Sequence, residues 1–186
     1  MYATILYFDE NTEETINRVW TKLSETNISN YHIDKNGSKK RPHITLADYE
    51  FLDLAHYEAR FNRFFADKSS LDIDFSMLGS FPKGGTLFLA PTITEALLHL
   101  HTDYHKAFSA YRKDKASYYL PGKWVPHLTI SNRLSHENLA AAFDLVGRTF
   151  EPIRARISEV VLIKILYENG VAAGSETVMS YQFTGS

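Results

Sequence analysis

The chain has 186 residues, of which 44% are hydrophobic and 23% are charged. This composition is typical of a globular protein with a buried core and excludes a disordered or fibrous chain. The absence of cysteine excludes disulfides, thiolate zinc sites and a cysteine nucleophile. The formal net charge of −2 at pH 7 argues against a strongly basic protein that binds nucleic acid regardless of sequence.

The first ten residues, "MYATILYFDE", lack the basic start of a secretory signal and reach an acidic residue after one short apolar run. No apolar stretch approaches the length of about 20 residues that a membrane-spanning helix needs. We therefore expect a cytoplasmic protein without a membrane segment, and we expect it to be a monomer.

The first third of the chain alternates predicted strands and helices. Residues 3–9 are rich in strand formers, and apolar residues at helical spacing predict a helix from about 12 to 26. "HITLADY" at 43–49 predicts a second strand. Residues 53–66 predict a second helix with one apolar face.

The middle of the chain predicts a β-hairpin followed by a helix. Residues 71–78 and 86–91 read as strands on either side of the turn "PKGG". Gly84 and Gly85 lack the Lys-Ser/Thr and the helix that follow in a phosphate-binding P-loop, so we interpret them as turn residues. A long helix is expected over 94–111.

The last third predicts a helix and two strands. The helix begins after Ser135, a suitable N-cap, with Asn138 in place of the Glu of a full capping box. Strands at 156–169 and 176–183 follow, joined through "GVAAG". This order predicts an α+β fold, a single domain over residues 1–186 with two interleaved, pseudo-symmetric lobes of antiparallel sheet flanked by helices.

One short motif occurs twice. "RPHITLADYE" at 41–50 and "VPHLTISNRL" at 125–134 both contain Pro-His-aliphatic-Thr-aliphatic, with the two histidines 84 positions apart. Because side chains alternate along a strand, the histidine and threonine of each motif point to the same face. If the lobes face each other, two imidazoles and two hydroxyls meet in one groove.

This set of side chains suits the cleavage of a phosphodiester. The reaction needs a base for the attacking oxygen and an acid for the departing oxygen, on opposite sides of phosphorus, and histidine serves either role near neutral pH. Threonine hydroxyls can donate to the non-bridging oxygens, where charge builds in the transition state. Hydrogen bonds of this kind contribute about 1.5–3 kcal/mol each.

Through these two motifs, their Pro-His context, Trp124 and the strand–helix order, the chain resembles the 2H phosphoesterases, specifically the bacterial 2′-5′ RNA ligase / RNA 2′,3′-cyclic phosphodiesterase branch. The resemblance implies two lobes around a central groove, and catalysis by His43, Thr45, His127 and Thr129 without a metal or another cofactor. It implies RNA ends or small nucleotides with a cyclic phosphate as partners. It also suggests that His127 activates water and that His43 protonates the departing ribose oxygen.

The resemblance extends less specifically to other substrate contacts. Members of the family place a further Arg, Lys or Tyr on the phosphate, and the candidates for substrate binding are Tyr167, Arg133, Lys83 and Trp124. Trp124, together with Tyr118 and Tyr119, would either stack on a base or anchor its loop. Ser131 shares the face of the second motif, and we interpret it as structural.

A basic segment precedes each motif. The segments contain Lys35, Lys39, Lys40 and Arg41 before the first motif, and Arg112, Lys113, Lys115 and Lys123 before the second. Both segments would rim the groove where a polyanionic substrate enters, or they are ordinary solvated loops.

Two alternatives remain open from the sequence. The same groove would also serve a catalytically silent module that binds nucleotides or RNA. A metallohydrolase is disfavoured because no carboxylate accompanies the two motifs. His101 and His105 have a spacing that can hold zinc, but Thr102 replaces the glutamate of the HExxH motif, so we interpret this helix face as solvated.

Overall fold

The computed structural model describes residues 1–111 and 117–184. The strands are β1 (Tyr2–Phe8), β2 (His43–Tyr49), β3 (Leu71–Phe81), β4 (Thr86–Pro91), β5 (Leu128–Ser131), β6 (Ile153–Glu168) and β7 (Val171–Gln182). The helices are α1 (Glu10–Glu25), α2 (Leu54–Phe65), α3 (Glu95–Ala107) and α4 (His136–Gly147), with short 3₁₀ turns η1 (Pro82–Gly84) and η2 (Ser109–Tyr111). None of the helices within the described residues is both long enough and apolar enough to cross a membrane.

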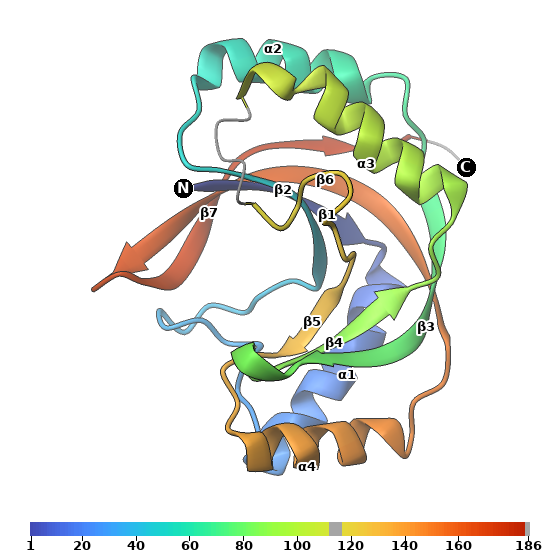
Figure 1. Cartoon of the computed structure of the whole chain (residues 1–186), viewed down its shortest axis with the longest axis vertical. Coiled ribbons are helices and arrows are strands. Elements are labelled where there is room, and N and C mark those ends of the chain that lie inside the picture. The colour runs from blue at the N-terminus through green and yellow to red at the C-terminus, as the bar shows by residue number, and fades with distance from the viewer. Residues whose placement is uncertain (112–116, 185–186) are drawn as a thin grey trace.

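The strands form one antiparallel sheet in the order β1-β2-β5-β4-β3-β6-β7, with β1 also paired to β6. The long strand β6 pairs with β3 at its start and with β1 and β7 further along, so it runs through both halves of the molecule. The predicted α+β class with antiparallel strands is confirmed, and the strands of both lobes belong to one continuous, strongly curved sheet (Figure 1).

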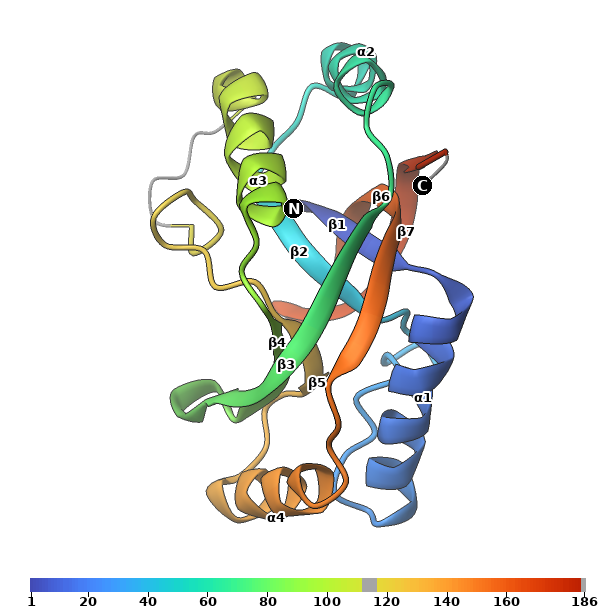
Figure 2. The same cartoon turned by 90° about the vertical axis from the view of Figure 1, so that its right-hand side faces the viewer.

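The helices lie at the two ends of this sheet. Helices α2 and α3 pack together at one end, whereas α1 and α4 pack together at the other (Figures 1 and 2). Because α1 lies beside β5 and β6 rather than beside the strand that follows it in the chain, the halves are interleaved, as the sequence predicts.

The helix starts follow from local sequence. The Asp9 carboxylate accepts a hydrogen bond from the Thr12 N–H at the start of α1, and the Ser135 hydroxyl accepts one from the Asn138 N–H at the start of α4. Such caps satisfy N–H groups that have no partner inside the helix. The predicted 94–111 helix ends earlier, at Ala107, and continues as the separate turn η2.

The "GVAAG" segment differs from the prediction. The chain turns at Asn169 and Gly170, both with positive φ, and Val171–Gly174 belong to strand β7. The small side chains of Ala172 and Ala173 are compatible with a strand that another segment approaches closely, and Lys35 N–H donates to the Ala173 carbonyl at 3.2 Å. A segment whose composition is typical of loops therefore forms the start of strand β7.

The two faces of the sheet carry different clusters. The main core lies under the helices, and on the opposite face a smaller cluster of buried residues is formed by Ala3, Ile5, Val161 and Ile163, with Tyr7 and Ile165 against it. Strand alternation explains the division, because Thr4, Leu6 and Phe8 point into the main core. The smaller cluster lies on the face that carries both histidine motifs.

Four hydroxyl groups form a closed network inside the main core. Tyr104 lies 2.8 Å from Thr4 Oγ1, 2.7 Å from the Tyr49 hydroxyl and 2.5 Å from the Tyr57 hydroxyl. Burial raises the pKa of Tyr57 to about 12, so its hydroxyl stays neutral. The network joins β1, β2, α2 and α3, and because its members are paired, their burial is tolerated.

The tip of the β3–β4 hairpin holds the segment that follows β5. Arg133 N–H donates to the Gly84 carbonyl at 3.1 Å, and Leu134 N–H donates to the Gly85 carbonyl at 3.0 Å. Gly85 has a φ of +58°, and a Cβ at this position would lie 2.1 Å from the Leu134 carbonyl oxygen. These glycines therefore form the predicted hairpin turn, and the structure shows that this turn also packs against another backbone segment.

We expect Gly85→Ala to lower the free energy of unfolding by at least about 3 kcal/mol, because it combines a left-handed backbone with a backbone clash. Gly122→Ala is the matched control, since Gly122 has a φ of +84° but open space around it. The control should lose only about 1–2 kcal/mol. Equal losses in urea unfolding of the two variants would contradict the packing described for the hairpin tip.

Candidate active site

Strands β2 and β5 bring the two motifs side by side. Ile44 of the first motif pairs with Leu128 of the second in antiparallel register, and both side chains are fully buried in the main core. In an antiparallel pair, the residue that precedes one partner lies opposite the residue that follows the other partner. The flanking residues of both motifs therefore lie together on the opposite face of the sheet.

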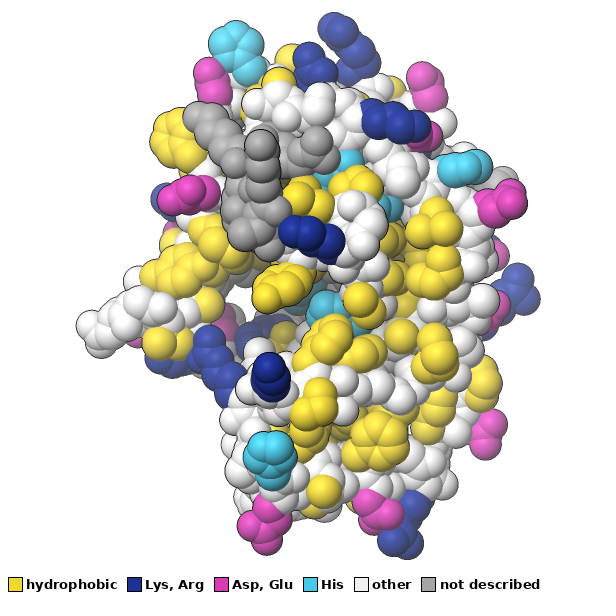
Figure 3. Space-filling view, in the orientation of Figure 1, with side chains coloured by type: hydrophobic (Ala, Val, Ile, Leu, Met, Phe, Trp, Pro, Cys, Tyr) yellow, Lys and Arg dark blue, Asp and Glu magenta, His cyan; other side chains and the backbone are white. Residues whose placement is uncertain are grey.

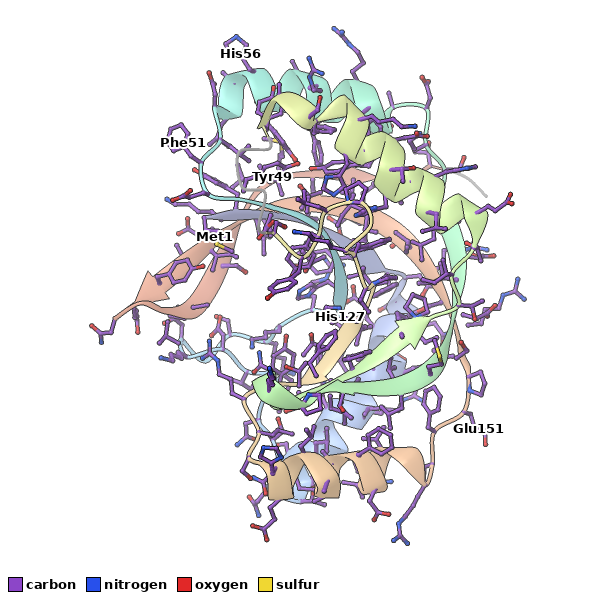
Figure 4. The ribbon with its side chains drawn as sticks, in the orientation of Figure 1. Met1, Tyr49, Phe51, His56, His127 and Glu151 are labelled. Carbon is purple, nitrogen blue, oxygen red and sulfur yellow. The ribbon has the colours of Figure 1, made fainter. Side chains whose placement is uncertain are left out.

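This register gives the four side chains a defined arrangement, which we call the HxT tetrad: His43, Thr45, His127 and Thr129. His43 lies opposite Thr129, and Thr45 lies opposite His127. The histidines therefore occupy diagonal corners, and diagonal residues of such a pair are about 7–8 Å apart, with their Cβ atoms somewhat closer. Figure 4 shows His127 near the centre of the molecule, between its two halves. The diagonal leaves room for a phosphate between the imidazoles.

Each imidazole is oriented by the backbone of its own strand. His43 Nδ1 lies 2.9 Å from the Arg41 carbonyl oxygen, and His127 Nδ1 lies 2.8 Å from the Val125 carbonyl oxygen. A carbonyl only accepts hydrogen bonds, so Nδ1 must carry a proton in both rings. In the neutral ring, Nε2 then has the free lone pair, and it is the atom available for proton transfer.

The environment favours the neutral imidazoles in the absence of an anion. Burial lowers the pKa of both histidines, while the hydrogen bonds to the carbonyls act in the opposite direction. The charges of Lys40 and His127 lower the pKa of His43 further. An anion bound between the rings would favour their charged forms, because an opposite charge within a few ångströms stabilises imidazolium.

Aromatic side chains enclose both rings. The His127 ring lies 5.2 Å from the Phe81 ring and 5.3 Å from the Phe88 ring, centroid to centroid, and the His43 ring meets the edge of Tyr7 at 6.2 Å. These contacts restrict the imidazoles to orientations set by strands β1, β3 and β4.

Two tyrosines lie beside the threonines, and the sequence analysis named Tyr119 but missed Tyr31. The Thr129 side chain lies next to the Tyr31 hydroxyl, and the Thr45 side chain lies next to the Tyr119 hydroxyl. Burial raises the pKa of Tyr31 to about 12 and also raises the pKa of Tyr119, so both hydroxyls remain neutral. The only signal in the sequence is that each tyrosine stands in the loop leading to one motif.

Trp124 and Ser131 anchor the site. Trp124 Nε1 donates to the Thr45 carbonyl at 3.0 Å, and its ring stacks on His101 with centroids 4.0 Å apart and planes inclined by 2°. Ser131 is fully buried, with its hydroxyl 2.6 Å from that of Ser29. Of the two alternatives for Trp124, these contacts favour the loop anchor over base stacking, and Ser131 is structural as expected.

The prediction that His101 and His105 lie on a solvated helix face is wrong. Both are buried, with 2% and 6% of their surface exposed. His101 Nε2 bonds to the Tyr119 carbonyl at 2.8 Å, and His105 Nε2 bonds to the Leu46 carbonyl at 3.2 Å. The loop before β5 covers this face of α3, which local helical periodicity does not reveal. Across the described residues no group of three or more His, Asp and Glu side chains is placed to hold a metal ion.

The basic segment before the first motif divides into two parts. Arg41 donates to Glu13 at 2.7 Å and to Glu159 at 2.9 Å, and its guanidinium lies over the Tyr7 ring at 3.8 Å. Arg41 is therefore neutralised by carboxylates, so of the two readings of the basic segment, a rim for a polyanion or a solvated loop, neither describes its side chain. Its backbone carbonyl, in contrast, is the acceptor that orients His43.

The three lysines of this segment line a cavity of about 560 Å³, and His43 also lines this cavity. In Figure 3, Lys and Arg side chains border a hollow in which a histidine is visible. The charged residues lining the cavity are Lys35, Lys39, Lys40, Arg41, Arg133 and Asp34. The predicted basic rim is thus present on the side of the first motif. A smaller cavity of about 320 Å³ lies between α1 and α4.

The remaining sequence candidates have other surroundings or lie outside the described residues. The Tyr167 hydroxyl bonds to Met1 Sδ at 3.2 Å near the outer end of the β6–β7 hairpin, and Lys83 is exposed in η1 at the tip of the β3–β4 hairpin. Tyr118 is 82% exposed. Arg112, Lys113 and Lys115, from the second basic segment, lie outside the described residues.

The sequence profile of the 2′-5′ RNA ligase superfamily matches residues 8–168, a range that contains both motifs. The chain belongs to the 2′-5′ RNA ligase superfamily. Membership makes it a protein of the 2H phosphoesterase type. No curated protein sequence matches the chain significantly.

Solved structures show the same fold at low sequence identity. E. coli LigT complexed with 3′-AMP has a TM-score of 0.62 and 12% identity, covering 99% of this chain and 98% of LigT. The protein TT0787 of Thermus thermophilus has a TM-score of 0.65 and 14% identity, covering 98% of this chain and 97% of that protein. The architecture of this superfamily member is therefore that of LigT along nearly its whole length.

We expect Arg41→Met to lower the free energy of unfolding by about 1–3 kcal/mol, because it leaves the buried Glu159 carboxylate without its cation. Methionine keeps an apolar side chain of similar reach beside Tyr7 but removes the charge and the hydrogen bonds to Glu13 and Glu159. The double variant Arg41→Met/Glu159→Gln should regain part of the loss, since the buried group is then neutral. No recovery in chemical unfolding of the double variant would show that the ion pair is not the cause.

Proposed function

We propose that the protein hydrolyses 2′,3′-cyclic phosphate or 2′-5′ phosphodiester bonds in RNA or small nucleotides without a metal ion. The observation that carries this proposal is the Ile44–Leu128 register, which supports two imidazoles at diagonal corners of one tetrad. E. coli LigT has been solved with 3′-AMP, ATP and NADP⁺, which supports a nucleotide as the ligand here. Ligation would use the same groups, with the 5′-hydroxyl of a second nucleotide attacking the cyclic phosphate in place of water.

In the proposed reaction, the Nε2 lone pair of His127 removes a proton from water as the water oxygen bonds to phosphorus. The bond from phosphorus to one ribose oxygen breaks on the opposite side. His43, as imidazolium, gives its Nε2 proton to that oxygen, so the product carries a phosphate monoester and a free ribose hydroxyl. His127 ends protonated and His43 neutral, and exchange with solvent restores the starting state.

The threonines stabilise the charge on the non-bridging oxygens in this proposal. Each Thr hydroxyl accepts from its neighbouring tyrosine, Tyr31 or Tyr119, and donates its own proton to a phosphate oxygen. Because both phenols are neutral, they remain donors at physiological pH. Preorganised donors of this kind lower the barrier without reorganisation during the reaction.

Of the four candidates for substrate binding, we assign direct contact to Arg133, which lines the cavity next to His43. Trp124 acts through the backbone of Thr45, to which it donates its indole N–H. Tyr167 and Lys83 are left out of the proposed site, because the Tyr167 hydroxyl bonds to Met1 and neither residue lines the cavity beside His43.

The division of labour between the histidines can be tested by the leaving group, with excess chelator present throughout. We expect His43→Ala and His127→Ala each to lose about 10²- to 10⁴-fold in turnover of a nucleoside 2′,3′-cyclic phosphate. A ribose alkoxide needs a proton to leave, whereas p-nitrophenolate does not. On a p-nitrophenyl phosphodiester, His43→Ala should therefore recover most of its loss, while His127→Ala stays impaired.

Other outcomes identify the alternatives. Recovery in His127→Ala instead would exchange the two roles. Recovery in neither variant would show that the histidines bind phosphate without acid–base catalysis. Wild-type turnover that the chelator abolishes would favour a metallohydrolase, and nucleotide binding without turnover would favour the catalytically silent module.

A further inference from the structure

The cavity beside His43 has two chemically different walls. Strands β1, β6 and β7 supply an apolar wall, formed by Ile5, Ile163, Ile165, Ala172 and Ala173. The segment before β2 and the segment after β5 supply a basic wall, formed by Lys35, Lys39, Lys40 and Arg133. A cavity with an apolar wall and a basic wall fits a nucleoside that carries a phosphate, because a base covers apolar surface while a phosphate needs cations.

Lys40 and Arg133 are like charges held close to each other. Lys40 Nζ lies 3.9 Å from the centre of the Tyr31 ring, which fixes it on the cavity side. Burial lowers the pKa of Lys40; the Asp34 carboxylate opposes this, and the nearby Arg133 charge adds to it. Neither cation forms an ion pair within residues 1–111 and 117–184, in contrast to Arg41. An anion between them would relieve their repulsion.

The backbone of Arg133 is held in a costly conformation. Its φ is 58°, a left-handed value that costs a residue with a Cβ about 1–2 kcal/mol. The hydrogen bond from its N–H to the Gly84 carbonyl, together with the close approach of Gly85, maintains this conformation. Observed strain of this kind is concentrated at functional sites, where the surrounding structure fixes a side chain in place.

The position of the cavity relates it to one side of the reaction. Its lining includes His43 and Tyr31. In the proposed mechanism, His43 protonates the departing ribose oxygen, so the nucleoside that carries this oxygen lies on the His43 side. A cavity of about 560 Å³ has room for one nucleoside and its 5′-phosphate.

We propose that Lys40 and Arg133 bind a second phosphate of the substrate, the one attached to the 5′-oxygen of the nucleoside whose cyclic phosphate is opened. The substrate is then the 3′ end of an oligonucleotide, or a 5′-phosphorylated nucleoside 2′,3′-cyclic phosphate, rather than an unphosphorylated nucleoside cyclic phosphate. This inference rests on the proposed function.

The test compares kcat/KM for adenosine 2′,3′-cyclic phosphate, its 5′-phosphorylated form and an adenosine dinucleotide that ends in a cyclic phosphate. We expect the wild-type protein to prefer both phosphate-bearing substrates by about 10- to 100-fold, the range for charge-assisted hydrogen bonds. Lys40→Met and Arg133→Met should each remove most of this preference. Lys164→Met is the matched control, because Lys164 is exposed on β6 and does not line the cavity.

The outcomes separate the inference from the proposed function. Equal kcat/KM for the three substrates in the wild-type protein overturns the second phosphate site while leaving the function standing. An equal loss on all three substrates in Lys40→Met and Arg133→Met, or the same loss of preference in Lys164→Met, also overturns it. Preference for the dinucleotide alone supports the site and identifies the internucleotide phosphate as its ligand. No turnover of any cyclic phosphate contradicts the proposed function itself.

Discussion

The arrangement of the site depends on one residue pair, Ile44 with Leu128, at which β2 and β5 meet. Both side chains are fully buried, and burying each contributes about 1.5–3 kcal/mol. A shift of this pairing by one residue would turn every side chain of a strand to the other face, so the same burial that stabilises the core also places the histidines and threonines on the outer face. The geometry of the HxT tetrad and the packing of the core are therefore set by the same register.

The two half-sites are alike in their backbone and different in their surroundings. Each imidazole donates Nδ1–H to the carbonyl two residues earlier, which leaves both Nε2 atoms free. His127 is enclosed by Phe81 and Phe88, whereas His43 lies beside Tyr7 and near Lys40. The basic cavity is lined by His43 and not by His127, so the two sides of the near-symmetric tetrad differ in charge. In our proposal, the second phosphate of the substrate lies on the His43 side.

Local patterns in the sequence predicted the order of the helices and strands and the shared face of each histidine and its threonine, although they misplaced the end of α3 and the start of β7. Strand alternation placed each histidine with its threonine, and the doubled motif indicated that they converge. Features that depend on distant segments were not predictable. The burial of His101 depends on a loop that stacks Trp124 on it, and the neutralisation of Arg41 depends on carboxylates from α1 and β6. Tyr31 does not belong to any helical or strand pattern in the sequence. Only the fold brings it beside Thr129.

The central claim is that both imidazoles hold one anion between them through Nε2. Its most direct test is a sulfate titration of protein with ¹⁵N-labelled histidine, followed by NMR near pH 6.5, because sulfate does not change its own charge there. Of the eight histidines in the chain, His43 and His127 should respond together with one affinity. Both should carry the proton on Nδ1 in the free protein and gain a proton on Nε2 as sulfate binds. A response from only one of them, or free rings protonated on Nε2 instead, would contradict the account.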